Sequence, residues 1–212
     1  MEKALSISQV LRINHPAITM GGEWGNCVGT IDRHGSVFFW GNSGNGKSTA
    51  VLSFCKELSR YGRVLYLPLE EGYSLSLQNS VRRLGLADCG SGFQILARTT
   101  FEDLDKRLSK PKSPEFVAID SLQYLGITYR QYQAFKTKHR NKLLIFISHA
   151  DGKQPAGRAA KSIMYDADLK IWVEGHTAFS KGRFIGETGK AVLWEKGAYD
   201  YWTLKKKQEE RI

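Results

Sequence analysis

The residues most suited to chemistry lie in one segment, Gly41-Asn42-Ser43-Gly44-Asn45-Gly46-Lys47-Ser48, which Thr49 follows. Every fixed position of the phosphate-binding pattern G-x-x-x-x-G-K-[ST] is filled in it. Glycines allow successive backbone N–H groups to point inward, and the N-terminus of a following helix adds to the attraction for phosphates. Lys47 would reach the β- and γ-phosphates of a nucleotide, and the Ser48 hydroxyl would bind Mg²⁺. We favour this nucleotide site over an ordinary glycine-rich turn.

Carboxylates follow two apolar runs farther along the chain. Residues 63–69 are expected to form a strand that ends before Glu70 and Glu71, where a carboxylate opposite the phosphates can polarise an attacking water. The alternative is a pair of solvated loop carboxylates. Residues 116–120 form a short apolar run that ends in Asp120, which is the pattern of a strand that holds Mg²⁺ directly or through water.

A histidine stands at the end of another predicted buried strand, residues 142–148. A lone histidine is most often structural. His149, however, would lie next to the γ-phosphate if this strand ends at the same edge of the sheet as the others, and we expect it to sense the nucleotide there.

These residues require a sheet with helices around it. Residues 37–40 form an apolar run typical of a buried strand, and from Lys47 onward apolar residues repeat with helical spacing. We expect a short amphipathic helix within 7–13, a loop or hairpin at 21–35, and a mobile loop at 150–162. Further strands are expected at 93–97, 168–173, 191–194 and 199–202, and further helices at 73–84, 100–108 and within 128–140.

Composition limits the class of protein. The 212 residues are 42% hydrophobic, which suits one α/β domain. The formal net charge of +10 is compatible with nucleic acid or an anionic surface as a partner, and charge alone does not exclude the alternative of a solvated basic protein. We expect a lead-in segment at 1–20, the domain at 21–204, and a frayed basic tail at 205–212. Three scattered cysteines predict reduced thiols and a cytoplasmic location, and no apolar stretch suggests a membrane span.

The order of these motifs resembles that of the RecA-like ATPases, and among them that of the DnaB-type replicative helicases and the RadA-type recombinases. The resemblance covers roughly residues 30–203. It is carried by the turn before the phosphate-binding strand, the glutamate strand, the strand that ends in His149, an Asp-Ala-Asp segment and a Lys-x-Arg segment. These matches lie at 34–37, 67–71, 147–149, 166–169 and 180–189.

The resemblance implies a mainly parallel, twisted sheet flanked by helices, with an antiparallel hairpin at one edge. It implies Mg²⁺-dependent hydrolysis of ATP, with Glu70 as the residue that activates water and His149 as the sensor. Lys181 and Arg183 would reach the γ-phosphate of a neighbouring subunit, an effect worth about 10³–10⁵ in rate in related enzymes. Such a contact predicts a homo-oligomer, either a hexameric ring or a filament.

The family's loops after two strands face a central channel or filament axis. The corresponding residues here are Tyr129 and Arg130 after Asp120, and Lys153, Arg158 and Lys161 after Ser148. We expect these residues to contact single-stranded DNA, as in a helicase or recombinase core. Two other interpretations are a nucleotide-dependent regulatory or assembly ATPase that does not bind nucleic acid, and a motor that acts on protein.

Overall fold

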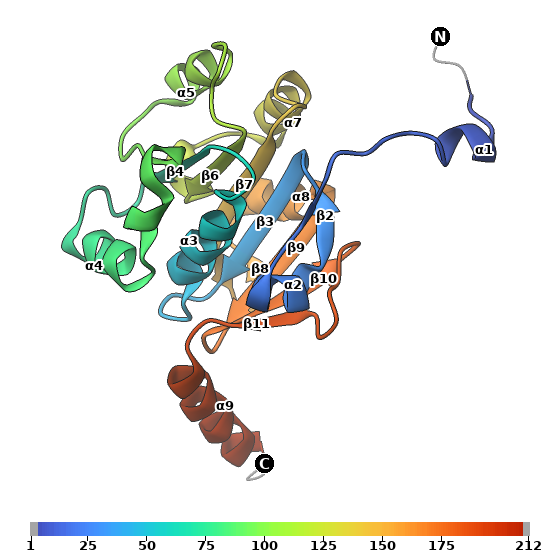
Figure 1. The fold of residues 1–212 in the computed structure, drawn as a ribbon. Helices are drawn as coiled ribbons and strands as arrows, with labels where there is room; N and C mark the ends of the chain where they lie inside the picture. Colours follow the sequence, from blue (N-terminus) through green and yellow to red (C-terminus); the bar gives the residue numbers. More distant parts are fainter. Residues whose placement is uncertain (1–3, 210–212) are drawn as a thin grey trace.

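The computed structural model describes residues 4–209, and within them one nine-stranded sheet dominates the fold (Figure 1). The strand order is β11-β10-β9-β3-β7-β6-β4-β5, and β8 pairs with the end of β7. The strands of this sheet are β3 (Gly35–Gly41), β4 (Val64–Pro68), β5 (Phe93–Ile95), β6 (Phe116–Asp120), β7 (Leu143–Asp151), β8 (Gln154–Pro155), β9 (Leu169–Glu174), β10 (Thr177–Gly182) and β11 (Lys190–Val192). A separate antiparallel pair consists of β1 (Ala17–Thr19) and β2 (Thr30–Asp32).

The six strands from β9 to β5 run parallel, whereas β10 and β11 add an antiparallel hairpin at one edge. Parallel strands are buried on both faces, which explains their almost unbroken apolar sequences. The expected fold class, a mainly parallel sheet flanked by helices with an antiparallel edge hairpin, is confirmed.

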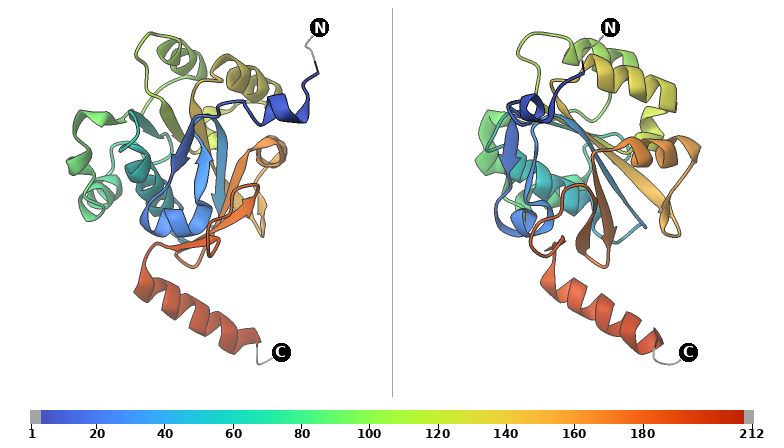
Figure 2. Two further views of the ribbon diagram at one scale, coloured as in Figure 1. Left: turned by 45° about the vertical axis from the view of Figure 1, so that its right-hand side comes forward. Right: turned by 90° about the vertical axis from the view of Figure 1, so that its right-hand side faces the viewer.

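Helices cover both faces of the sheet (Figure 2). On β3, Val37 and Phe39 join one core and Phe38 and Trp40 join the other, because side chains alternate along a strand. The first core receives α2 and α3, and the second receives α5, α7 and α8. The helices are α1 (Ile7–Val10), α2 (Gly22–Val28), α3 (Lys47–Leu58), α4 (Leu75–Arg83), α5 (Phe101–Leu108), α6 (Leu122–Leu125), α7 (Tyr129–Lys138), α8 (Arg158–Asp166) and α9 (Glu195–Glu209), with a 3₁₀ segment at Leu86–Gly92.

The C-terminal region differs from the expectation. Residues 199–202 were expected to form a strand, but they lie in α9, which projects from the carboxyl-end side of the sheet (Figure 1). Tyr201 and Lys205, one turn apart on α9, both contact Glu174. This i, i+4 pair ties the helix to the end of β9 and supports the helical period over the strand period. Five residues of the expected tail belong to α9, and 210–212 lie outside the described residues.

Two expected loops contain regular structure. Residues 22–28 form α2, whose Trp24 packs edge-to-face against Phe54 with 4.9 Å between ring centroids. The segment expected as a mobile loop at 150–162 continues β7 to Asp151, turns into β8, and begins α8 at Arg158. In both segments, burial of a few apolar side chains outweighs the glycine-rich composition.

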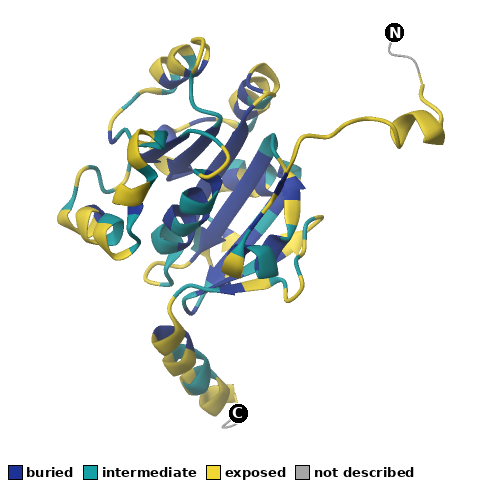
Figure 3. Ribbon diagram, in the orientation of Figure 1, coloured by how far each residue is buried: buried dark blue, intermediate teal, exposed yellow. Residues whose placement is uncertain are grey.

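The N-terminal segment forms a short helix, as expected, but α1 does not pack on the domain. Ile7 and Leu11 are 78% and 81% exposed, and α1 lies away from the sheet (Figure 3). Across residues 4–209, no helix combines the length and the apolar character needed to cross a membrane.

Candidate nucleotide-binding site

The glycine-rich segment lies between β3 and α3, as the sequence predicts. Gly46 immediately precedes α3 with a φ of 91°, a left-handed conformation that favours glycine. Gly41 ends β3 where a Cβ atom would lie 2.2 Å from the carbonyl oxygen of Val173 on β9. Lys47 donates a hydrogen bond of 2.9 Å from Nζ to the carbonyl oxygen of Asn42. Burial lowers the pKa of Lys47, and the nearby carboxylates of Asp120 and Glu70 oppose that shift.

Asp120 ends β6 directly beside the first turn of α3. Its Oδ2 accepts hydrogen bonds from the Ser48 hydroxyl at 3.3 Å and from the Tyr66 hydroxyl at 2.7 Å. Burial raises the pKa of Asp120, and the Tyr66 hydrogen bond opposes this shift. Burial and the adjacent Asp120 also raise the pKa of Tyr66, so this phenol remains a donor.

The donor set at Asp120 suits Mg²⁺. None of the ion pairs within residues 4–209 involves Asp120, so its buried carboxylate lacks a direct cationic partner there. Mg²⁺ is commonly bound by one or two protein oxygens together with substrate phosphates. Ser48 and Asp120 fit that pattern, and the described part of the chain holds no cluster of three His, Cys, Asp or Glu side chains that would form an all-protein metal site.

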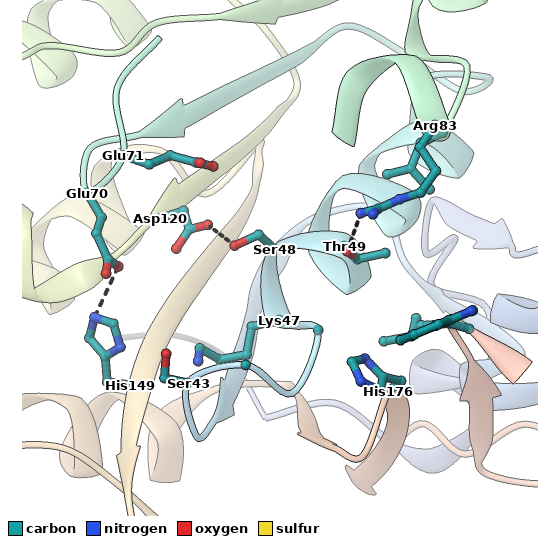
Figure 4. Close-up of a pocket in the computed structure, with 15 residues that line it drawn as sticks. Ser43, Lys47, Ser48, Thr49, Glu70, Glu71, Arg83, Asp120, His149 and His176 are labelled. Atoms are coloured by element: carbon teal, nitrogen blue, oxygen red, sulfur yellow. Dashed lines mark hydrogen bonds and ion pairs between the residues drawn. The ribbon is translucent and has the colours of Figure 1, made fainter. Parts of the chain in front are cut away.

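Glu70 and Glu71 follow β4 but make different contacts (Figure 4). Glu70 Oε2 lies 3.1 Å from Nε2 of His149, which extends from β7. Glu71 instead accepts hydrogen bonds from the hydroxyls of Ser74, at 2.9 Å, and Ser76. Ser74 is the N-cap of α4, so Glu71 supports the start of that helix while Glu70 is paired with the predicted sensor.

These residues line one cavity of about 950 Å³ at the carboxyl ends of the parallel strands. Several residues of the cavity wall carry no signal in the sequence. Arg83, at the end of α4, donates a hydrogen bond from Nη2 to the Thr49 hydroxyl at 3.1 Å. The cavity also contacts Leu84, His176, Leu193 and Trp194. No local sequence pattern marks these positions, because the end of α4, the turn after β9 and the segment after β11 reach the glycine-rich segment from separate parts of the chain.

Lys181 and Arg183 lie at the opposite edge of the sheet. Gly182 pairs with Leu169, and Leu169 pairs with Val37. Val37 precedes the end of β3 by four residues, or about 13 Å along a strand. The Arg183 side chain is 78% exposed, with Nη1 3.7 Å from Asp168 Oδ1. The structure thus keeps both cations away from the chain's own glycine-rich segment.

The residues predicted to contact DNA separate into two groups. Lys153 lies in the turn between β7 and β8, where its carbonyl oxygen accepts a hydrogen bond of 3.1 Å from the Trp40 indole. Arg158 and Lys161 are exposed on α8. At the start of α7, Arg130 is exposed, whereas the Tyr129 ring stacks on Tyr132 at 5.9 Å. The structure therefore does not leave Tyr129 free on a loop.

Comparisons with known proteins place these features in context. No protein-family model matches the chain. The chain is 32% identical to the DNA repair protein RadA of Streptococcus pneumoniae (strain ATCC BAA-255 / R6), over 91% of this chain and 50% of that protein. It thus spans about half the length of this curated relative. It is also similar to the crystal structure of a KaiC-like protein from Pyrococcus horikoshii OT3, with a TM-score of 0.61, 14% identity, and coverage of 84% of this chain and 99% of that one. The second likeness concerns the fold alone.

Proposed function

The chain belongs to the RecA-like P-loop ATPase family, and from this premise we propose that it couples Mg²⁺-dependent ATP hydrolysis to binding or movement on single-stranded DNA. The observation that carries the proposal is the convergence of Lys47, Asp120 and the Glu70–His149 pair on one cavity. Fold alone does not determine function, so the proposal rests on these side chains and on the exposed cations described below.

The phosphates of ATP would bind at the start of α3. Backbone N–H groups of the glycine-rich segment would donate to them, and Lys47 would neutralise charge on the β- and γ-phosphates. The hydroxyl of Ser48 and the carboxylate of Asp120 would hold Mg²⁺, directly or through water. When bound, this ion supplies further neutralisation of the phosphate oxygens.

Glu70 would orient the attacking water and accept its proton. The His149 contact at 3.1 Å positions the Glu70 carboxylate, and both side chains line the same cavity as Lys47, so a γ-phosphate bound by Lys47 would lie near this pair (Figure 4). His149 would then sense whether the γ-phosphate is present, because its ring can exchange the contact with Glu70 for one with phosphate. Glu71 is already engaged by two serine hydroxyls and is not assigned this role.

Lys181 and Arg183 would act on the nucleotide of a neighbouring subunit. Their position at the amino ends of the parallel strands fits this role, since the glycine-rich segment 41–48, here called the P-loop, lies at the carboxyl ends. A cation at the transferring phosphate stabilises the charge of the transition state. We therefore propose a homo-oligomer, a hexameric ring or a filament, in which each active site is completed by the next chain.

The DNA-binding surface would lie on the β7–β8 turn and α8. Arg158, Lys161 and Tyr165 fall on one face of α8, because residues three, four and seven apart share a helix face. Tyr165 is 72% exposed and offers the stacking surface that Tyr129 does not. The turn is tied to the P-loop, since Asn42 Nδ2 donates to the carbonyl oxygen of Gly152 at 3.3 Å. Through this contact, a change in the nucleotide bound at the P-loop would alter the position of the DNA-binding surface.

The discriminating experiment measures single-strand binding across salt concentrations with ATP and Mg²⁺ present. The triple variant Lys153→Ala, Arg158→Ala, Lys161→Ala should bind more weakly, and its log K against log salt slope should flatten by about 0.7 for each lost phosphate contact. The matched control removes the same charge on and after α5, through Lys106→Ala, Arg107→Ala and Lys110→Ala.

Equal behaviour of the two triple variants would show that only overall charge matters. No binding of the wild-type protein to the single strand, with ATP hydrolysis intact, would favour a regulatory or assembly ATPase that does not bind nucleic acid, or a motor that acts on protein.

A further inference from the structure

The cavity has a second end that the proposed hydrolysis does not use. Glu70 and His149 lie at one end, and Arg83 and His176 lie at the other (Figure 4). The lining residues at this second end come from four separate parts of the chain. They are Thr49, Arg83, Leu84, His176, Leu193 and Trp194.

The P-loop holds this second end in place through Asn45. The side-chain oxygen of Asn45 accepts a hydrogen bond of 2.7 Å from the backbone N–H of Gly175, and its carbonyl oxygen accepts one of 3.2 Å from His176. The carbonyl oxygen of His176 in turn accepts one of 2.9 Å from Leu193. A Cβ atom on Gly46 would lie only 3.2 Å from the His176 ring. The turn after β9 therefore rests directly on the phosphate-binding segment.

Trp194 is the largest side chain at this end. Its ring meets His176 edge-to-face, with 4.9 Å between centroids and 72° between planes. A Cβ on Gly197 would lie 2.1 Å from the Trp194 ring, so the ring also covers the first turn of α9. Trp194 is nevertheless 55% exposed. It is a fixed aromatic surface that remains open toward the cavity.

Arg83 approaches from the other side. Its guanidinium is held near the opening by the hydrogen bond to Thr49, on the first turn of α3. A planar guanidinium stacks well on aromatic rings, and indole is the strongest partner among aromatic side chains for such contacts. Thr49 immediately follows Ser48, so this second end of the cavity begins next to the proposed phosphate site.

We propose that Trp194 and Arg83 form a clamp that stacks on the base of the nucleotide whose phosphates bind the P-loop, and that this clamp selects purines over pyrimidines. The inference rests on the proposed nucleotide hydrolysis and adds the residues that hold the base. The lining at this end offers stacking surfaces and the apolar contacts of Leu84 and Leu193. The Thr49 hydroxyl is already engaged by Arg83. The clamp therefore reads the size of the ring system and treats adenine and guanine alike.

The test compares wild-type protein with Trp194→Ala and Trp194→Phe, using MgATP, MgGTP, MgCTP and Mg²⁺-tripolyphosphate as ligands in calorimetry. Trp194→Ala should weaken ATP and GTP binding by about 5- to 150-fold, the range for loss of one base–aromatic stack, and leave tripolyphosphate binding unchanged. Trp194→Phe should retain most of the affinity. Tyr199→Ala is the matched control, because Tyr199 is 72% exposed on α9 and does not line the cavity.

Fluorescence gives a second readout, since ATP should quench the wild-type protein, which has five tryptophans, more than Trp194→Phe. Unchanged ATP affinity in Trp194→Ala would overturn the clamp and leave the proposed hydrolysis standing. An equal loss of tripolyphosphate binding would also overturn it, because Trp194 would then be structural. CTP binding as tight as ATP would refute the purine preference. A wild-type protein that binds neither ATP nor tripolyphosphate would refute the proposed function together with the clamp.

Discussion

Tyr66 offers a stringent test of how the protein holds its buried carboxylate. Tyr66 is fully buried on β4, and its hydroxyl donates the 2.7 Å hydrogen bond to Asp120. Replacement by phenylalanine removes this hydroxyl and keeps the ring, so the change isolates the hydrogen bond from the packing of the core. Asp120 would keep the Ser48 hydroxyl, at 3.3 Å, as its remaining side-chain donor.

The expected loss of stability follows from the charge and burial of the acceptor. A hydrogen bond to a charged group contributes about 1.5–3 kcal/mol, and each kcal/mol shifts the melting temperature of a chain of this size by about 2–4 °C. Tyr66→Phe should therefore lower the melting temperature by about 3–12 °C near pH 7. Because burial already raises the folded-state pKa of Asp120, its charge costs stability as pH rises above the unfolded pKa of about 3.9. The difference between variant and wild type should shrink as pH falls toward 4.

Tyr132→Phe is the matched control. Tyr132 is also fully buried and donates at 2.7 Å to a carboxylate, Asp166, but that side chain is 33% exposed and also contacts Lys136 at 3.0 Å. Water and Lys136 can replace the lost hydrogen bond to Asp166, so Tyr132→Phe should lower the free energy of unfolding by only about 0.5–1.5 kcal/mol. The stability losses of both variants are measured by thermal and urea unfolding, followed by circular dichroism with and without a non-hydrolysable MgATP analogue. Equal losses, or a change below about 0.5 kcal/mol in Tyr66→Phe, would refute the reasoning.

Three further outcomes are expected. Glu70→Gln should bind ATP and lose turnover, whereas Glu71→Gln should keep turnover and melt at a lower temperature, as phosphate release and calorimetry will show; the reverse result would move the catalytic role by one residue. Mixing Arg183→Ala with Glu70→Gln subunits should restore part of the ATPase rate, because some interfaces then combine an intact Glu70 with an intact Arg183; no recovery at any ratio would argue against action between subunits. Burial raises the pKa of Asp166, but its hydrogen bonds to Tyr132 and Lys136 lower it more, so the folded pKa lies below the unfolded value. The stability that Asp166 contributes is therefore present above about pH 3.9 and lost as pH falls through the folded pKa, and Asp166→Asn should flatten this acid loss in urea unfolding.

The sequence contained the information that locates one end of the cavity. Asp120, Glu70 and His149 each follow an apolar run, and the carboxyl ends of parallel strands share one edge of a sheet. Their meeting at the P-loop follows from strand direction alone. The sequence does not decide between Glu70 and Glu71, because both follow β4 and both line the cavity. They differ in their partners, since His149 contacts Glu70 and the serines at the start of α4 engage Glu71.

The other end could not be inferred in the same way. His176 reaches the P-loop through a hydrogen bond to Asn45, more than a hundred residues earlier in the chain, and Trp194 through its contact with His176. The helical conformation at Tyr201 also depends on a distant segment. A Cβ on Gly175 would lie 2.2 Å from the Tyr201 ring, so this glycine leaves the space in which α9 docks. This fit depends on two segments that are far apart in the sequence, so no periodicity within either segment predicts it.

The direction of the strands also constrains how copies of the chain would complete each other's sites. The P-loop follows β3 at the carboxyl edge, whereas Arg183 follows β10 at the amino edge. A two-fold symmetric dimer could complete both sites only if one self-complementary patch contained the P-loop together with Arg183. A head-to-tail contact joins the two edges without that requirement, and such contacts close into rings or extend into filaments. A short filament of n chains would then contain n − 1 completed sites and a ring n. For this reason we expect ATPase activity per chain to rise with protein concentration, and to reach a plateau at low concentration if the assembly is a closed ring.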